Sequence, residues 1–214
     1  NMNTFGLRAY YRPTQFGRLS IEYHTTNEFR RGGNKFDLEP FETDITEQTK
    51  HVINSGGLTY DLFWKEYKHK LSFYTSAQHV DRNSYYGAQQ DPNAYGKTKD
   101  LTFVGGGMYV GNFDKVLFSP ATFTAGLEYS HNNMHDIMAG YNRDLEQKVR
   151  IASAFFQNEW KMNDFTLLAG FRLDDHNLIE NLIFSPRVNL LYKPSDALQG
   201  RLTWSTGFRA PQAY

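Results

Sequence analysis

The sequence predicts an all-β protein whose antiparallel strands run up and down as the wall of a transmembrane β-barrel. About ten segments alternate apolar and polar residues, and the connections between them alternate short and long along the chain. Period-two alternation gives each strand one apolar and one polar face, as a wall between lipid and water requires. Aromatic residues make up 16% of the 214 residues, which is typical of a barrel with aromatic girdles at both membrane interfaces.

The composition excludes several other classes of protein. The 23 basic and 23 acidic residues balance, so net charge gives no reason to expect nucleic-acid binding. The absence of cysteine excludes disulfide scaffolds, thiolate metal sites and cysteine nucleophiles. No run of 18 apolar residues predicts a transmembrane helix. The first residues lack the basic and apolar parts of a signal peptide, so we expect a mature chain or a piece of a longer one.

The first four strands are expected at residues 4–12, 18–26, 45–61 and 67–81. In the second of them, Leu19, Ile21 and Tyr23 alternate with charged and polar residues, and the fourth repeats this pattern. Gly56 and Gly57 weaken the pattern in the third strand, so its facing is not determined. Short turns follow the first and third strands, whereas polar loops are expected at residues 27–44 and 82–97.

Strands five to eight are expected at residues 98–111, 121–131, 148–161 and 165–175. Gly105-Gly106-Gly107 in the fifth strand indicates a bulge or a close approach of another backbone, and the facing of this strand also stays open. Residues 112–120 form the expected short connection between strands five and six, and 163–164 lie within the tight turn before strand eight. Polar loops are expected at residues 132–147 and 176–181.

The last two strands form the clearest hairpin, between Ser185 and Arg209, with a turn at residues 194–196. Its apolar face includes Val188, Leu190, Leu202 and Trp204. The opposite face should line the barrel interior with Arg187, Asn189, Arg201, Thr203 and Ser205. Trp160 and Trp204 are expected to belong to the lipid-facing aromatic girdle.

Several of these segments resemble parts of the TonB-dependent outer-membrane receptors. Residues Phe184–Asp196 and Thr206–Gln212 resemble the mid-barrel hairpin of that family. Gln89–Gly96 and Arg30–Lys35 resemble its Bacteroidetes branch, and Phe156–Trp160 fits the same region of the barrel. The resemblance covers nearly the whole chain, although it does not identify a ligand.

The resemblance implies a 22-stranded barrel plugged by an N-terminal domain, in the outer membrane of a Gram-negative bacterium. Such a receptor imports a ferric siderophore, haem or cobalamin with energy from the TonB–ExbB–ExbD complex. About ten strands correspond to a central part of this barrel, so we expect residues 1–214 to lack the plug domain and the remaining strands. Those missing parts, outer-membrane lipid and a surface lipoprotein are the implied partners, without nucleic acid or cofactor.

The best candidates for ligand contact lie in the second long loop. Aromatic rings and amide groups at a loop tip suit sugars, corrins or catecholates, although outer loops are often rich in such residues without binding anything. The candidates are Tyr85, Tyr86, Gln89, Gln90, Asp91, Asn93 and Tyr95. The resemblance implies that the interior residues of the last hairpin contact the plug domain and do not bind the nutrient.

Two histidines are weaker candidates. His131 and His135, with Asp136 beside them, suit haem or metal contact, but without a third firm ligand the alternative is a polar surface loop. We therefore predict no metal site. The segment Phe208–Pro211 resembles a box of haem receptors and also occurs in siderophore-type relatives, so it does not choose between them.

The sequence does not indicate an enzyme. Asp174 and Asp175 precede His176, but neighbouring strand residues point to opposite faces and cannot converge as a catalytic pair. We find no nucleophile elbow, phosphate loop or zinc motif. The alternatives left open are a passive porin and, with a convergent Ser/His/Asp cluster at the rim, a barrel lipase or protease. Among nutrients, oligosaccharides also remain candidates.

Overall fold

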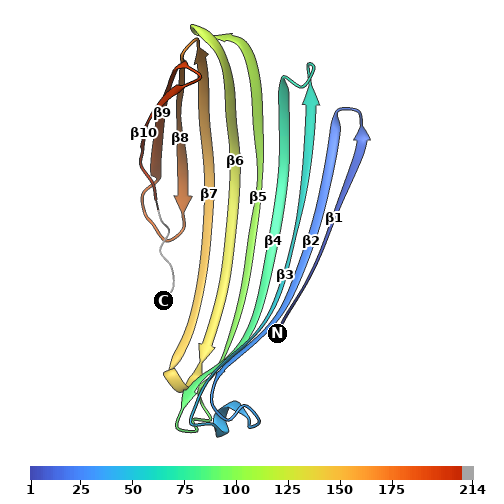
Figure 1. Ribbon diagram of the computed structural model, residues 1–214, viewed down its shortest axis with the longest axis vertical. Coiled ribbons are helices and arrows are strands. Elements are labelled where there is room, and N and C mark those ends of the chain that lie inside the picture. The colour runs from blue at the N-terminus through green and yellow to red at the C-terminus, as the bar shows by residue number, and fades with distance from the viewer. Residues whose placement is uncertain (209–214) are drawn as a thin grey trace.

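All ten predicted strands are present and form one antiparallel sheet in the computed structural model, which describes residues 1–208 (Figure 1). Each strand pairs with the next along the chain, so the order in the sheet is the order in the sequence. The strands are β1 (Met2–Thr14), β2 (Gly17–Gly33), β3 (Ile45–Trp64), β4 (His69–Ala88), β5 (Tyr95–Val116), β6 (Ser119–Met138), β7 (Arg143–Met162), β8 (Phe165–His176), β9 (Ile183–Ser195) and β10 (Leu198–Ser205).

The connections alternate in length, as predicted. Tight turns join the strands of each hairpin at one end of the sheet, which we call the short-turn end. Longer connections lie at the other end, the long-connection end (Figure 1), and two of them contain single turns of 3₁₀ helix, η1 (Pro40–Glu42) and η2 (Ala139–Tyr141). Among residues 1–208, no helix is long and apolar enough to cross a membrane.

The long loops expected from the sequence are too long. The connection expected at residues 27–44 spans only 34–44, that at 82–97 only 89–94, and that at 132–147 only 139–142. On the short-turn side, the connection expected at 112–120 shrinks to residues 117–118. The reason is that strand pairing needs only backbone hydrogen bonds, whereas alternation disappears once both faces of a strand contact water.

Strand pairing assigns every central residue to one of two faces, including those of β3 and β5. Leu58 of β3 pairs with Ile21 of β2 and Thr75 of β4, so even positions of β3 share the face of the apolar residues on its neighbours. Phe103 of β5 pairs with Ala77 of β4, which puts odd positions of β5 on that face. We call this the apolar face and the opposite side the polar face.

Gly106 lies close to the backbone of β6 and to the Tyr74 side chain, although β5 makes no bulge there. Its register with β4 and β6 runs without interruption through residues 105–107, so the bulge that the sequence allowed is absent. A Cβ at Gly106 would lie 2.6 Å from the Tyr74 hydroxyl and 2.7 Å from the Leu127 carbonyl oxygen. The alternative expectation, a close approach of another backbone, is the one the structure supports.

The sheet is a single layer without a packed apolar core. Among residues 1–208, the buried apolar side chains are Tyr85, Ala94 and Ala121. On the apolar face, by contrast, Leu7, Leu127 and Leu202 are 61%, 67% and 71% exposed. A water-soluble protein buries such side chains, because transfer from water stabilises by about 25 cal/mol per Å² of apolar surface. The apolar face is therefore built for a non-aqueous surrounding.

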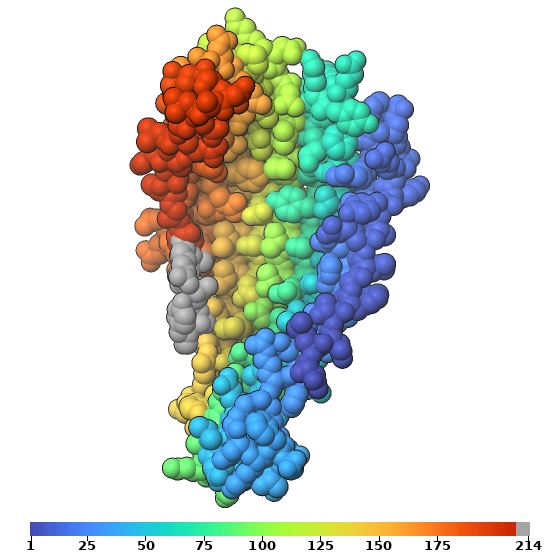
Figure 2. Space-filling model, in the orientation of Figure 1, coloured from blue at the N-terminus to red at the C-terminus, as the bar shows by residue number. Residues whose placement is uncertain are grey.

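The sheet curves but does not close. Figure 2 shows the middle strands set back between the β1–β2 edge and the β9–β10 edge. Within the described residues, β1 pairs with β2 and β10 with β9, and these two outer strands do not pair with each other. The structure is thus part of a barrel wall with two open edges.

Aromatic side chains cluster on the apolar face near the short-turn end. Trp64 stacks on His69 and Tyr109 at centroid distances of 5.4 and 5.9 Å. Trp160 stacks on Phe118 at 5.8 Å and donates a hydrogen bond from Nε1 to the carbonyl oxygen of Val116 (3.1 Å). This arrangement is typical of an interfacial girdle. Trp204 also lies on the apolar face, opposite Val188, but farther from this end.

Candidate functional site

The polar face carries a hollow of 380 Å³ near the long-connection end of β2, β3 and β4. Most of its lining comes from polar-face positions of three neighbouring strands, which alternation brings to one side. Its residues are Arg30, Arg31, Gly32, Glu47, Thr49, His51, Arg82 and Tyr86. Guanidinium, imidazole and phenol groups together suit an oxygen-rich anionic ligand.

One wall of this hollow is held by a buried carboxylate. Asp136 of β6 is 3% exposed, accepts a hydrogen bond from Thr98 Oγ1 (2.5 Å) and lies 2.8 Å from Arg143 Nε. Arg82 Nη2 lies 3.4 Å from the same carboxylate and donates to Thr98 Oγ1 (2.8 Å). Two cations around one carboxylate leave positive charge for a ligand, and their shared hydrogen bonds restrict the Arg82 side chain.

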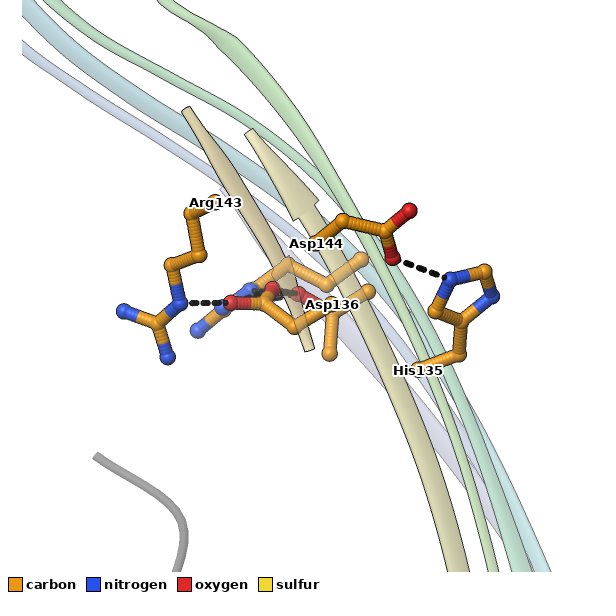
Figure 3. A network of polar contacts seen from close by, with 6 residues as sticks. His135, Asp136, Arg143 and Asp144 are labelled. Carbon is orange, nitrogen blue, oxygen red and sulfur yellow. Dashed lines mark hydrogen bonds and ion pairs between the residues drawn. The ribbon is translucent and has the colours of Figure 1, made fainter. Parts of the chain in front are cut away.

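Figure 3 shows how alternation separates neighbouring residues of this region. Asp136 and Arg143 lie on one side of the β6–β7 pair, whereas His135 and Asp144 lie on the other. His135 Nε2 is 2.9 Å from Asp144 Oδ1. Neighbours in the sequence therefore belong to different networks, one on the polar face and one on the apolar face.

On the β2–β3 side, two lining residues contact a carboxylate that does not itself line the hollow. Glu28 lies 2.7 Å from Arg30 Nη2 and 3.4 Å from His51 Nδ1. The Arg30 side chain is 73% exposed, so its guanidinium reaches into solvent beyond this pair. An exposed cation on a short ion pair can exchange its partner for a ligand at low energetic cost.

A second polar network lies deeper on the polar face and joins four strands. Arg172 of β8 donates to Glu128 (2.9 Å), Asp174 (2.7 Å) and Ser153 (2.7 Å). Glu128 also accepts from the Tyr74 hydroxyl at 2.7 Å. The sequence did not predict this network, although all its residues have polar-face parity. The pattern of a single strand does not show which charges on neighbouring strands will meet.

The predicted interior residues of the last hairpin do lie together on the polar face. Asn189 pairs with Thr203, whose hydroxyl donates to the Asn189 side chain, and Arg187 pairs with Ser205. Arg201 and Arg187 help to line a hollow of 160 Å³. The set thus forms a continuous polar surface beside β8.

The predicted ligand-contact residues are divided between strands and a loop. Tyr85 and Tyr86 belong to β4 and Tyr95 to β5, whereas Gln89, Gln90, Asp91 and Asn93 form the connection. Tyr85 is 1% exposed, and its hydroxyl donates to the Asp91 carbonyl oxygen (2.9 Å). Burial raises the pKa of the Tyr85 phenol further above neutral pH. Tyr85 supports the loop from beneath, while Tyr86 lines the hollow.

The histidine candidates do not converge with further ligands. His131 and His135 lie on β6 at apolar-face positions and not in a loop. The His135 ring forms a hydrogen bond with the Asp144 carboxylate. Among residues 1–208, no group of three or more histidine, aspartate or glutamate side chains is placed to hold a metal ion. Phe208 is the last described residue of the predicted haem-receptor box, and residues 209–211 lie outside the described part.

The carboxylates considered for catalysis are separated, as the alternation argument requires. Asp174 pairs with Ser153 on the polar face, whereas Asp175 pairs with Ala152 on the apolar face. Ser153 donates its hydroxyl hydrogen bond to Asp174 at 2.6 Å, so this serine is held by a carboxylate instead of facing a histidine base. The contact is part of the Arg172 network and gives no nucleophile–base pair.

The chain matches one protein family over its full length. The family model described as "TonB dependent receptor-like, beta-barrel" matches residues 1–214. No curated protein sequence matches at a significant level.

Solved structures with a similar fold include two receptors from Pseudomonas aeruginosa. The siderophore receptor PirA superposes with a TM-score of 0.76 at 15% identity, over 100% of this chain and 35% of that one. A mutant of the ferric enterobactin receptor PfeA gives a TM-score of 0.74 at 18% identity, over 98% and 33%. FpvAI in complex with pyocin S2 gives 0.76 at 9% identity, over 95% and 34%. At these identities the likeness establishes the fold, and the chain spans about a third of each structure.

Proposed function

Because the chain belongs to the family of TonB-dependent receptor-like β-barrels, we propose that it is part of an outer-membrane receptor that imports a scarce, bulky nutrient. Energy would reach the receptor from the TonB–ExbB–ExbD complex through the plug domain. The outer membrane of a Gram-negative bacterium is the corresponding location. The observation that carries the proposal is the family match over all 214 residues. The sheet agrees with it, because one of its faces is apolar and the other is charged.

We propose further that residues 1–214 form a central section of a barrel of about 22 strands. An unpaired strand edge in lipid leaves backbone N–H and C=O groups unsatisfied, at a cost of several kcal/mol for each group. Both β1 and β10 have such an edge within residues 1–208. Additional strands would pair with them, and the plug would fill the interior against Arg187, Asn189, Arg201, Thr203 and Ser205.

Among nutrients, we propose an anionic ferric siderophore as the first candidate, ahead of haem, cobalamin and oligosaccharides. The hollow with Arg30, His51, Arg82 and Tyr86 supports this choice, because three guanidinium groups and one phenol line it together with a single carboxylate, Glu47. The solved structures of similar fold include siderophore receptors, which agrees with it. The loop residues from Gln89 to Asn93 would contact the ligand from above.

The remaining assignments depend on the resemblance of individual segments. Residues 30–35 and 89–96 support placing the receptor in the Bacteroidetes branch, where a surface lipoprotein would be an additional partner. The proposed role needs no catalytic group. The family match does not favour the passive porin that the sequence left open, whose transport would need no energy source.

The proposed function is tested by measuring uptake in the native bacterium. Deletion of the full-length gene should abolish uptake of one radiolabelled ferric siderophore, haem or cobalamin, and a plasmid copy should restore it. Dissipating the proton gradient should stop uptake in the complemented strain, because the energy is transmitted from the inner membrane. Uptake that persists without the gradient would overturn the receptor in favour of a channel.

A matched pair of variants tests the proposed ligand hollow. Arg30→Gln removes an exposed cation that pairs with Glu28, and Arg8→Gln removes one that pairs with Glu22 on the same face outside the hollow. We expect Arg30→Gln to raise the siderophore concentration for half-maximal uptake several-fold, and Arg8→Gln to leave it unchanged. Equal effects would show that the hollow does not recognise the ligand.

A further inference from the structure

The apolar face contains a hollow of 620 Å³ between β4 and β8. Small residues form its floor, because Gly107, Ala125 and Ala154 occupy apolar-face positions on three neighbouring strands. Larger side chains such as Phe73, Leu127 and Phe156 surround them. The lining is almost entirely apolar, so hydrocarbon fits this hollow better than water or a polar ligand.

Basic side chains occupy the same face just beyond the hollow, toward the long-connection end. Arg150 of β7 pairs with His131 of β6, two apolar-face positions beyond Ala154 and Leu127. Lys99 of β5 pairs with His135 one strand away. Lys148 and Lys97 follow along the same strands, so the cations lie on β5 and β7, on either side of the β6 histidines.

Several of these charges lack a partner within the protein. In the part of the chain that the structure describes, the side chains of Lys97, Lys99 and Arg150 are exposed and form no hydrogen bond or ion pair. Lys148, by contrast, lies 2.6 Å from Glu146.

The acidic residues nearby do not cancel these charges. Asp144 and Glu146 are already engaged by His135 and Lys148. Asp81 stands opposite Lys99 and makes no ion pair among residues 1–208. Asp175, on the apolar face of β8 opposite Ala152, likewise makes no ion pair among these residues. Three unpaired cations therefore face two unpaired carboxylates, and an anion from outside the protein would complete the arrangement.

The spacing along β7 places these cations at the edge of the hydrocarbon layer. Trp160 belongs to the aromatic cluster at the short-turn end, and Arg150 lies ten positions farther along the strand. A tilted transmembrane strand crosses the hydrocarbon in about 9–11 residues. Arg150 therefore reaches the opposite interface, while the hollow around Ala154 lies at the middle of the layer.

We propose that this surface binds one phosphorylated lipid of the outer leaflet, with its acyl chains in the hollow and its phosphate near Arg150, Lys99 and His131. The inference rests on the proposed location in the outer membrane. A lipid with several acyl chains and an anionic head has apolar and charged parts in the order that the surface offers them. A transmembrane protein partner would fill the hollow but leave the cations unpaired, which is why we favour the lipid.

Binding is tested with purified full-length protein in detergent, using diphosphorylated lipid A as the probe. Bound lipid is counted by native mass spectrometry during titration. The double variant Lys99→Gln/Arg150→Gln should weaken binding roughly tenfold or more, about 1.4 kcal/mol or greater. Ala154→Phe, which fills the hollow, should also weaken binding while leaving the cations in place.

Matched controls separate a site from general attraction. Lys115→Gln removes another exposed lysine near the short-turn end, which makes no ion pair among residues 1–208, and should leave binding unchanged. Lipid A without phosphates, and inorganic phosphate without a lipid, should each bind poorly. Equal lipid retention by the double variant and the parent, or an equal loss in Lys115→Gln, would overturn the proposal.

The outcome is separable from that of the proposed function. Loss of lipid binding in the double variant, with energy-dependent import of the nutrient unchanged, would support the lipid site and leave the receptor proposal intact. If the parent protein imports nutrient but never retains lipid A, the lipid site is wrong and the receptor stands. If the protein is absent from the outer membrane, the receptor proposal fails first.

Discussion

The two faces of the sheet stabilise the protein in opposite ways. On the polar face, side chains satisfy one another across strands, as Arg172 does with Glu128, Asp174 and Ser153. On the apolar face around Leu127, side chains are exposed and depend on contacts outside the chain. A globular protein buries its apolar groups and exposes its charges, whereas a barrel wall in lipid does the reverse. The face of a residue, more than its chemical type, therefore decides what a substitution costs.

The strongest challenge to this comparison is a charge placed on the apolar face. Leu127→Arg should lower the free energy of unfolding from lipid vesicles by about 2–4 kcal/mol, because an arginine at the bilayer midplane loses its hydration. Guanidinium titration of the full-length protein measures the change. The matched control, Thr124→Arg on the polar face of the same strand, should cost less than about 1 kcal/mol. Similar losses at both positions would contradict the assignment of the faces.

A smaller effect is expected when the polar face loses the centre of its network. Arg172→Ala removes the one charged donor that Glu128 and Asp174 share and should destabilise by about 1.5–3 kcal/mol in the same titration. Arg12→Ala is the control, because that exposed side chain makes no hydrogen bond or ion pair among residues 1–208. Its effect should stay within about 0.5 kcal/mol. If the two variants lose the same stability, the network does not stabilise the sheet.

The smallest effect is expected at Tyr85, where the difference between the two faces no longer applies. Tyr85 has apolar-face parity, yet it lies beyond the membrane-spanning part and supports the connection at residues 89–94. Tyr85→Phe should weaken local stability by about 0.5–1.5 kcal/mol through loss of one hydrogen bond. Faster amide exchange in residues 89–94 would report this. Tyr86→Phe, on the polar face, should leave exchange there unchanged, and a reversal of the two results would refute the supporting role of Tyr85.

Much of the fold could be predicted because alternation acts on single strands. Ile21, Phe73 and Val188 each alternate with polar neighbours, and the structure puts all three on one face. The prediction of loop lengths was wrong where both faces are wet. Residues 82–88 pair as a strand without any apolar pattern, because backbone hydrogen bonding does not depend on side-chain polarity.

The sequence by itself therefore determined the class of fold, the number of strands and the alternating order of short and long connections, since these follow from local periodicity. Only the tertiary structure decided the facing of β3 and β5, the Arg172 network, and the meeting of Arg82 with Asp136 from strands 54 positions apart in the chain. Such contacts depend on the register between strands. Register is set by cooperative pairing across the whole sheet, and a one-residue shift would move every side chain to the other face.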